Sequence, residues 1–347
     1  MNAQQSLLVL AAIATAACGG ARATIPDSTN PFGVAPPPGA KAEFSVIPVA
    51  LTGTLTPLGN LNPPGHTLPT DHVYFYTQDF DHVSPAVPGQ VRAVYAPATG
   101  TIDFMLHFTD SDDWKVQFIV TDNFGYYFDH LHPRADLKVG TIVHSGDSVG
   151  TQGPTGALDL GAYDLSTTLT GFITPSRYPL QSLHCVSPYK YFVEPLRSQL
   201  YARIRRSPAT ADKDGRIDFS VPGRLVGDWY HESLAATADA SAGPNGWPKN
   251  LAFVYDYYDP SLVRVSIGGT IAKPGVWGIE PSAPRPETVS VESGKVSYRL
   301  MYTESTTVQS GLMIVQMLDD KRIRVEVFEG SHASTADFDT NAQIYLR

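Results

Sequence analysis

Short runs of alternating hydrophobic and polar residues recur along most of the chain, and this period of two is typical of β-strands. A first group of runs lies between residues 44 and 174, where Trp114–Val120 is a clear example. A second group lies between residues 224 and 346, with the spacing of consecutive hairpins. Helical spacing of apolar residues occurs in Pro188–Arg206, before a basic last turn. The pattern predicts an all-β protein with one helix.

Composition supports this fold class. The chain has 347 residues, including 28 prolines and 29 glycines, and its 17 tyrosines and 15 phenylalanines together outnumber its 25 lysines and arginines. Frequent turn residues and aromatic residues favour short strands over long helices. The formal net charge of -9 leaves no general cationic surface that would attract a phosphate backbone. We therefore expect no nucleic-acid partner.

Composition also divides the chain into four segments. Residues 1–17 carry no charged side chain and contain an apolar run of signal-peptide length, about half of what a membrane-spanning helix needs. Residues 18–42 are small, polar and rich in proline, which is typical of a tether that does not fold. We expect a first β domain with a C-terminal helix over residues 43–206. A second, antiparallel β domain is expected over residues 207–347.

The end of the first segment predicts how the protein is attached. Small residues followed by Cys18 resemble a bacterial lipobox, in which the cysteine is acylated after cleavage. Two acyl chains hold a protein on a membrane where one does not. We therefore expect an exported lipoprotein of the bacterial cell envelope, anchored through Cys18 in the periplasm or at the cell surface. Plain secretion is the alternative. The other cysteine, Cys185, is expected to be a buried and inert thiol.

The chemically informative motifs lie between residues 65 and 164. In chain order they are Gly65–His72, Val94–Ile102, Tyr126–Leu131, Leu137–Gly150 and Gly156–Tyr163. This order resembles the M23 family of zinc peptidases, the lysostaphin-like peptidoglycan hydrolases, over about a third of the chain. Its most specific part is His130-Leu131 followed by the glycine-spaced segment Val139–Gly150. The resemblance implies that the first domain is an antiparallel β-sandwich.

The resemblance also implies a zinc site. In this family a His and an Asp near the start of the domain bind zinc together with the second His of a closing His-x-His motif, and the metal-bound water attacks a peptide bond. Position by position, His66 and Asp71 correspond to the first two ligands and His130 corresponds to a catalytic histidine. Ala157 and Asp159 stand in place of the two closing histidines. Asp159 has the chemistry of a third ligand, whereas Ala157 has no acid–base capacity.

Other interpretations of these residues remain open at this point. His66, His72, His130 and His132 form a rival ligand set, because His130 and His132 alternate along one strand and so share a face. Asp212–Asp218 resembles part of a calcium loop but lacks the distal glutamate, so we interpret it as a turn.

The second domain carries one short motif. Gly227-Asp228-Trp229 resembles the opening of lipocalin-type barrels, in which the indole closes one end. The motif favours a lipocalin-like antiparallel barrel, with an antiparallel sandwich as the alternative. A barrel of this kind can carry a small apolar ligand.

Three functions are compatible with these patterns, and whether the chain is an enzyme stays open. We favour an M23-like envelope protein whose catalysis is altered or lost and which binds or regulates peptidoglycan or an envelope protein. The second is an active zinc metallopeptidase that hydrolyses peptidoglycan, with Asp159 completing the site. The third is a small-ligand carrier that acts through the barrel.

Overall fold

The computed structural model describes residues 33–51, 53–76, 92–109, 111–153, 156–303, 305 and 307–347. The predicted signal segment and Cys18 lie outside these ranges, so export and lipid attachment stay predictions. Within these ranges, no helix combines the length and the apolar character needed to cross a membrane.

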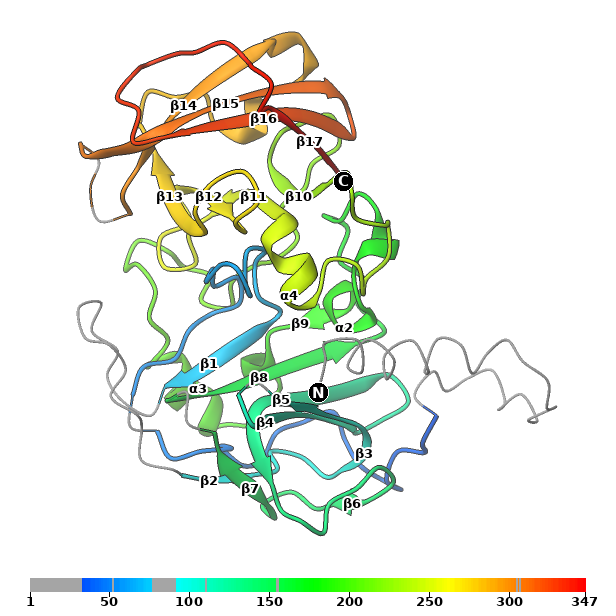
Figure 1. Cartoon of the computed structure of the whole chain (residues 1–347). Helices are drawn as coiled ribbons and strands as arrows, with labels where there is room; N and C mark the ends of the chain where they lie inside the picture. Colours follow the sequence, from blue (N-terminus) through cyan, green and yellow to red (C-terminus); the bar gives the residue numbers. More distant parts are fainter. Residues whose placement is uncertain are drawn as a thin grey trace, which may run out of the picture.

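The described residues form two antiparallel β-sheets and only short helical segments, which confirms the all-β fold class (Figure 1). The main strands of the first sheet, in spatial order, are β1 (His72–Tyr76), β8 (Ala157–Asp164), β5 (Phe124–Pro133), β4 (Asp113–Ile119), β3 (Gly100–Phe108) and β6 (Ile142–Val143). Three short strands extend it: β2 (Ala93–Tyr95) pairs with β7 (Ser148–Gln152), β7 also pairs with β5, and β9 (Cys185–Val186) pairs with β8.

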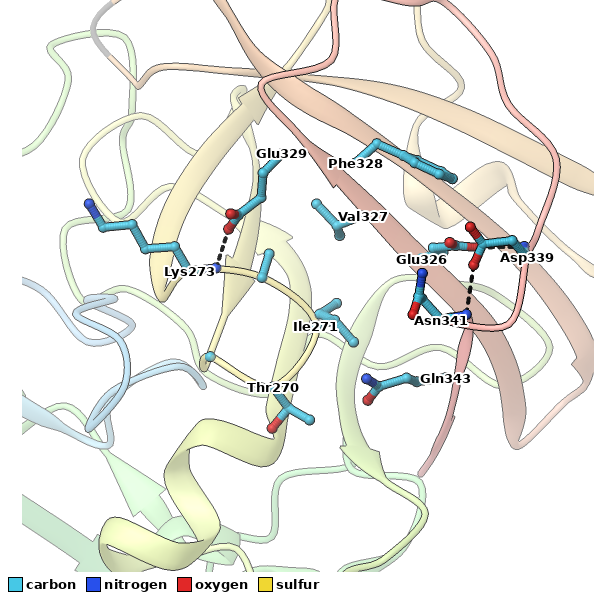
Figure 2. Close-up of a pocket in the computed structure, with 12 residues that line it drawn as sticks. Thr270, Ile271, Lys273, Glu326, Val327, Phe328, Glu329, Asp339, Asn341 and Gln343 are labelled. Carbon is cyan, nitrogen blue, oxygen red and sulfur yellow. Dashed lines mark hydrogen bonds between the residues drawn. The ribbon is translucent and has the colours of Figure 1, made fainter.

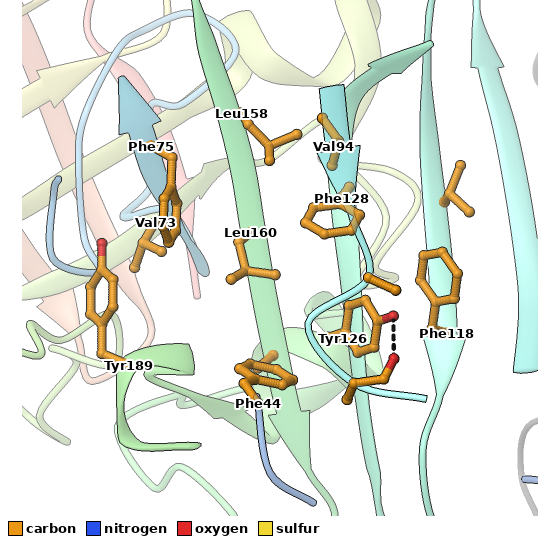
Figure 3. Close-up of a cluster of buried hydrophobic side chains, with 14 of the residues drawn as sticks. Phe44, Val73, Phe75, Val94, Phe118, Tyr126, Phe128, Leu158, Leu160 and Tyr189 are labelled. Carbon is orange, nitrogen blue, oxygen red and sulfur yellow. Dashed lines mark hydrogen bonds between the residues drawn. The ribbon is translucent and has the colours of Figure 1, made fainter. Parts of the chain in front are cut away.

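Alternation along the strands gives the first sheet two different faces. One face is apolar, and Figure 3 shows its side chains Val73, Phe75, Leu158, Leu160, Tyr126 and Phe128 packed in the core of the domain. Successive side chains of a strand point to opposite faces. The residues between these apolar positions, among them His72, Tyr74 and Asp159, therefore lie together on the other face.

The helix predicted for Pro188–Arg206 is much shorter in the structure. A 3-10 turn, η2 (Pro188–Tyr191), is followed by a six-residue helix, α3 (Leu196–Tyr201). Between them the backbone hydrogen-bonds to Phe44. Pro195 has no N–H to donate and disfavours a helical conformation in the residue before it, so a continuous helix cannot form here.

The remaining helical segments are short. They are η1 (Pro175–Arg177), α2 (Leu180–Leu183), α4 (Gly243–Gly246), η3 (Trp247–Lys249), η4 (Pro286–Thr288) and η5 (Val291–Ser293).

The last part of the predicted tether packs against the first sheet. Val34 contacts a small buried cluster formed by Ile119, Tyr127 and Tyr163. Ala40 packs against the main core of the domain. Residues 34–42 are therefore part of the folded domain, because their apolar side chains are anchored on it.

The second sheet closes on itself as a barrel, so the barrel and not the sandwich is correct for this region (Figure 1). Its strands, in order around the barrel, are β10 (Gly227–His231), β11 (Asn250–Tyr255), β12 (Val263–Ile267), β13 (Gly275–Ile279), β14 (Lys295–Met301), β15 (Gln309–Asp319), β16 (Arg322–Glu329) and β17 (Gln343–Leu346). Antiparallel pairing of β17 with β10 closes it.

Large apolar and aromatic side chains form the barrel core. Trp229 on β10 is fully buried in the same apolar cluster as Phe253. Its indole Nε1 donates a hydrogen bond to the carbonyl of Leu225 at 2.8 Å. The guanidinium of Arg347, directly after β17, lies 4.4 Å from the indole ring centroid. Trp229 thus joins the first strand of the barrel to the end of the chain.

Candidate functional site

The register of three neighbouring strands brings polar residues together on the polar face of the first sheet. Tyr74 on β1 lies opposite Asp159 on β8. Asp129 on β5 lies opposite Asp159 from the other side. His72 is two residues before Tyr74 and therefore projects from the same face. Residues far apart in the sequence thus meet at Asp159.

Asp159 is the centre of this group. Its Oδ2 lies 3.3 Å from Nε2 of His72 and 3.7 Å from Nε2 of His130. The ring of His66, in the loop before β1, meets the ring of His72 edge-on with the centroids 5.2 Å apart. The Asp159 side chain is only 1% exposed, whereas that of His130 is 29% exposed. We call His66, His72, His130 and Asp159 the His–Asp cluster.

Asp71, the predicted second ligand, is bonded to other partners. Its Oδ1 accepts a hydrogen bond from the Tyr127 hydroxyl at 2.7 Å and lies 3.2 Å from Nδ1 of His72. Its Oδ2 accepts a hydrogen bond from the Ser182 hydroxyl at 2.5 Å. His72 Nδ1 therefore faces Asp71, whereas His72 Nε2 lies 3.1 Å from the Tyr74 hydroxyl and 3.3 Å from Asp159 Oδ2.

A glycine on β8 lets Tyr127 reach Asp71. Gly161 lies opposite Tyr127, and a Cβ atom at Gly161 would stand 2.1 Å from the tyrosine ring. No side chain other than hydrogen fits between this ring and the sheet. Lys115 Nζ lies 3.6 Å from the centroid of the same ring and donates to Asp129 Oδ2 at 2.9 Å. Tyr127 is thus held between the sheet and a charged pair beside Asp159.

His130 has an unusual backbone conformation and a buried partner. Its φ of 60° lies in the left-handed region that residues other than glycine seldom adopt. Its ring Nδ1 donates to Oδ2 of Asp113 at 2.5 Å, and Asp113 is fully buried. The other Asp113 oxygen accepts the Ser111 hydroxyl at 2.8 Å. Asp113 therefore orients the ring so that Nε2 faces Asp159, and backbone strain of this kind is found at functional sites.

Burial shifts the pKa values of the cluster. It lowers the pKa of His66 to about 3, and the neighbouring His72 acts in the same direction. Burial raises the pKa of Asp159 to about 6, although His72 and His130 oppose this. For His130, burial is outweighed by the Asp113 hydrogen bond and the charge of Asp159, so its pKa rises to about 9. At neutral pH a neutral His66 thus lies near an ionised Asp159 and a protonated His130, a pattern typical of functional sites.

The structure tests whether these residues suit the zinc ion of the M23 family. Among the residues described, no group of three or more His, Cys, Asp and Glu side chains is arranged to hold a metal ion. Asp71 is turned to Tyr127 and Ser182 and is not brought to Asp159. The donors around Asp159 nevertheless have the chemistry of a zinc site, namely imidazole and carboxylate. Asp159 Oδ1 is also buried without a hydrogen-bond partner among the described residues, which leaves this oxygen available to a cation.

The sequence motifs identified part of this site and missed part of it. They named His66, His130 and Asp159, which the fold brings together, and they included His72 only in the rival set. The fourth member of that set, His132, lies opposite Thr151 on β7. Lys115, Asp113 and Asp129 were not identified. The only available signal for His72 was its alternation with Val73 and Tyr74 at the start of a strand.

Ala157 lies at the edge of the polar face of the first sheet. It lies opposite Tyr76, one side-chain pair beyond Asp159 and Tyr74. Its methyl group can neither accept nor donate a proton. The structure thus places a residue without acid–base capacity next to the His–Asp cluster.

Asp212–Asp218, the other acidic motif, uses its carboxylates within the fold. Asp212 Oδ1 accepts the N–H of Asp214 at 2.9 Å, and Asp214 Oδ1 accepts the Tyr201 hydroxyl at 2.6 Å. Asp218 Oδ2 accepts the N–H of Gly171 at 3.0 Å. These bonds fit the interpretation of this segment as a turn.

A separate cleft of about 560 Å³ lies on the barrel (Figure 2). It is lined by the β12–β13 loop, β16 and the segment before β17. Glu329 accepts the N–H of Lys273, and Glu326 accepts the N–H of Asp339 at 2.9 Å. These two glutamates of β16 therefore hydrogen-bond the β12–β13 loop and the segment before β17 to the barrel. The apolar side chains that would bind a carried ligand are packed against one another in the barrel core.

Comparisons with known proteins concern only part of the chain. No protein-family model and no curated protein matches it. Among solved structures it is similar to Csd3 of Helicobacter pylori, with 19% identity, a TM-score of 0.26, and coverage of 36% of this chain and 30% of that chain. It is also similar to a zinc-containing peptidase from Vibrio cholerae, with 14% identity, a TM-score of 0.26, and coverage of 36% and 37%.

A third similar structure is a putative M23 peptidase from Pseudomonas aeruginosa. The identity is 19%, the TM-score is 0.28, and the match covers 46% of this chain and 56% of that chain. The chain thus spans about a third of the length of the first two structures and about half of the third.

Proposed function

We propose that this protein is an exported, lipid-anchored component of the bacterial cell envelope that binds peptidoglycan peptides through the polar face of its M23-like domain, with peptide hydrolysis lost or strongly reduced. The observation that carries this proposal is the pair Ala157 and Asp159 on β8. Ala157 stands where the M23 pattern has an acid–base histidine, and Asp159, two residues further along β8, lies within ion-pair distance of His72 and His130.

The polar face has the groups that a peptide ligand requires. Lys115 and Asp129 form an ion pair beside Asp159, and their side chains are 24% and 13% exposed. His130 is partly exposed and held as a hydrogen-bond donor by Asp113. A peptide carries carboxylates, amines and amide groups, and each of these can replace one member of such a pair. Recognition without cleavage is therefore chemically possible at this site.

The loss of one acid–base group is large enough to separate binding from hydrolysis. A positioned general acid or base contributes typically about 10²–10⁴-fold in rate. No proton-transfer group stands at position 157. Purified protein should therefore sediment with peptidoglycan sacculi but leave the turbidity of a cell-wall suspension unchanged.

One test of binding and one test of hydrolysis address this interpretation. Lys115→Gln should weaken sedimentation with sacculi, whereas Lys138→Gln, at an exposed lysine outside the polar face, should not. The double variant Ala157→His/Asp159→His should gain measurable hydrolysis because it restores the family's histidines. Rapid lysis by the unaltered protein that is abolished by His66→Ala would show that the protein is an active metallopeptidase and that our proposal is wrong.

The location has its own test. Cys18→Ser should release the protein from the membrane fraction or leave the precursor uncleaved, because the acyl chains have no attachment point. Mass spectrometry of the mature N-terminus should find a lipid on Cys18. A mature chain that starts downstream of Cys18 without lipid would instead indicate plain secretion.

A further inference from the structure

Strand β16 continues past the end of its pairing with β17, and this leaves part of one strand edge open. The pairs between β16 and β17 end at Val325 and Gln343, whereas β16 runs on to Glu329. On its other side β16 stays paired with β15 as far as Glu329. From Glu326 to Glu329 the barrel therefore has a free strand edge, and these residues line the cleft of about 560 Å³.

Main-chain groups of Val327 and Glu329 face this open edge. In an antiparallel ladder, successive residues direct their N–H and C=O groups alternately toward the two neighbouring strands. The N–H of Gly330, directly after β16, bonds to the carbonyl of Ser310 on β15. The odd-numbered Val327 and Glu329 therefore direct theirs to the other side, where no strand of the described part of the chain pairs with them. An added strand forms its hydrogen bonds with groups of this kind.

The cleft along this edge is acidic. Among the described residues that line it, Glu326, Glu329 and Asp339 carry carboxylates, and Lys273 carries an ammonium group. Figure 2 shows Glu326 and Asp339 together on one flank of the cleft. Glu326 is only 3% exposed, and burial and the negative charge of Asp339 both raise the pKa of its carboxyl group. A cation beside two such carboxylates is favourable because it offsets their repulsion.

The side of the cleft that faces the barrel interior is apolar. Ile271 and Ala272 of the β12–β13 loop pack against the barrel core, as does the side chain of Val327. Successive side chains of a strand point to opposite faces. A strand added at the free edge would therefore direct one side chain toward Ile271 and the next toward Glu326 and Asp339.

We propose that this cleft binds an extended peptide segment of a partner protein, with alternating basic and apolar side chains, as an additional strand on the free edge of β16. Main-chain hydrogen bonds to Val327 and Glu329 would supply affinity, and the alternating side chains would supply specificity. The segment stays outside the barrel core, which apolar side chains already fill. The inference does not depend on peptidoglycan binding, because the cleft belongs to the barrel and not to the first sheet.

The test is calorimetric titration of the full-length protein with short peptides whose two ends are capped. The peptide Val-Lys-Val-Lys-Val should bind with one equivalent, whereas Val-Glu-Val-Glu-Val should show no binding because like charges repel. A third peptide has the lysine sequence with an N-methyl group on its central valine, which is the residue that directs its N–H to β16 when the valines face Ile271. It keeps both charges but cannot donate this hydrogen bond, so it should bind about 10-fold more weakly or worse.

Variants of the protein locate the binding. Glu326→Gln should weaken binding of the lysine peptide about 10-fold or more, because it removes the charge that faces the ammonium group. Glu292→Gln, at an exposed glutamate of η5 outside the cleft, is the matched control and should leave the affinity unchanged. Circular dichroism shows whether each variant is folded. If Glu326→Gln does not fold, Asp339→Asn at an exposed position replaces it with the same expected loss.

Three results would overturn the inference. The first is that the lysine peptide does not bind the unaltered protein. The second is equal affinity for the unaltered protein, Glu326→Gln and Asp339→Asn, which would mean that the peptide is attracted only by the net negative charge of the chain. The third is equal affinity of the lysine peptide with and without the N-methyl group, because the ligand would then not pair with the edge of β16.

Discussion

The first sheet and the barrel use the same alternation of side chains for opposite purposes. In the barrel, closure by β17 and β10 makes one face an enclosed interior, which apolar residues such as Trp229 and Phe253 fill. In the first sheet one face packs in the core, while the other collects His72, Asp159 and Lys115. An open sheet can thus keep titratable groups on one face, whereas the interior of the closed barrel is filled with apolar side chains. The comparison predicts that the stability of the barrel core depends mainly on packing, whereas the stability of the polar face of the first sheet depends mainly on electrostatic contacts.

The largest expected effect is on the barrel core. Trp229→Ala removes a fully buried indole, its hydrogen bond to Leu225 and its contact with Arg347. Substitutions of this kind cost about 3–5 kcal/mol. The melting temperature measured by circular dichroism should therefore decrease. Trp114→Ala, at a partly buried position on β4, is the control and should cost less. Equal losses in the two variants would contradict the packing argument.

A buried carboxyl group of the barrel gives the next effect, which depends on pH. Burial raises the pKa of Asp228 to about 7, against a usual value of 3.8. The folded state therefore binds the proton more tightly, and the free energy of unfolding falls as pH rises from about 4 to about 7. Above pH 7 the free energy of unfolding is lower by on the order of 4 kcal/mol at most, because one pKa unit corresponds to about 1.4 kcal/mol.

Asp228→Asn should remove this pH dependence. In the unaltered protein the Tyr178 hydroxyl donates a hydrogen bond to Asp228 Oδ2 at 2.9 Å. The asparagine amide keeps an oxygen that can accept this hydrogen bond, but it carries no charge. Melting temperatures measured from pH 4 to pH 8 should be flatter for the variant, and higher than the unaltered protein's at pH 8. Asp122→Asn, at an exposed turn, serves as the control. A variant that loses stability at pH 8 would contradict the assignment.

On the polar face, the expected effect comes from the buried partner of His130. Asp113→Asn replaces a carboxylate that accepts from His130 Nδ1 at 2.5 Å. Hydrogen bonds to charged groups contribute about 1.5–3 kcal/mol. We expect a stability loss of this size, and nuclear magnetic resonance of the His130 ring nitrogens should show a change in protonation at Nδ1. An unchanged ring spectrum would mean that Asp113 does not orient His130.

The smallest expected effect concerns Gly161, which leaves space for the Tyr127 ring on the polar face of the first sheet. Gly161→Ala places a methyl group against the Tyr127 ring and should displace the Tyr127 hydroxyl from Asp71. Overpacking typically costs about 1–3 kcal/mol. Gly65→Ala, where an added Cβ meets nothing within 4 Å, should be nearly neutral. If Gly161→Ala is equally neutral, Tyr127 does not need the glycine to reach Asp71.

Much of the fold could be predicted because alternation is a local property. The period of two in segments such as Trp114–Val120 marks strands directly, and the spacing of strands after residue 224 indicated hairpins. The helix over Pro188–Arg206 was predicted too long, since the apolar spacing was counted across Pro195. There the chain bonds to Phe44, some 150 positions earlier in the sequence. Only the folded chain supplies such a partner.

The sequence by itself determined the all-β fold class, and it named Ala157, Asp159, His66 and His130 as candidate site residues. Tertiary structure decided which of two adjacent residues, Asp71 or His72, faces Asp159. A strand that begins one residue earlier or later exchanges the side chains that reach each face of the sheet. Pairing of β1 with β8 fixes that register, so His72 points at Asp159 while Asp71 turns to Tyr127 and Ser182. Spacing along one chain cannot specify this, because the register depends on contacts between strands almost ninety residues apart.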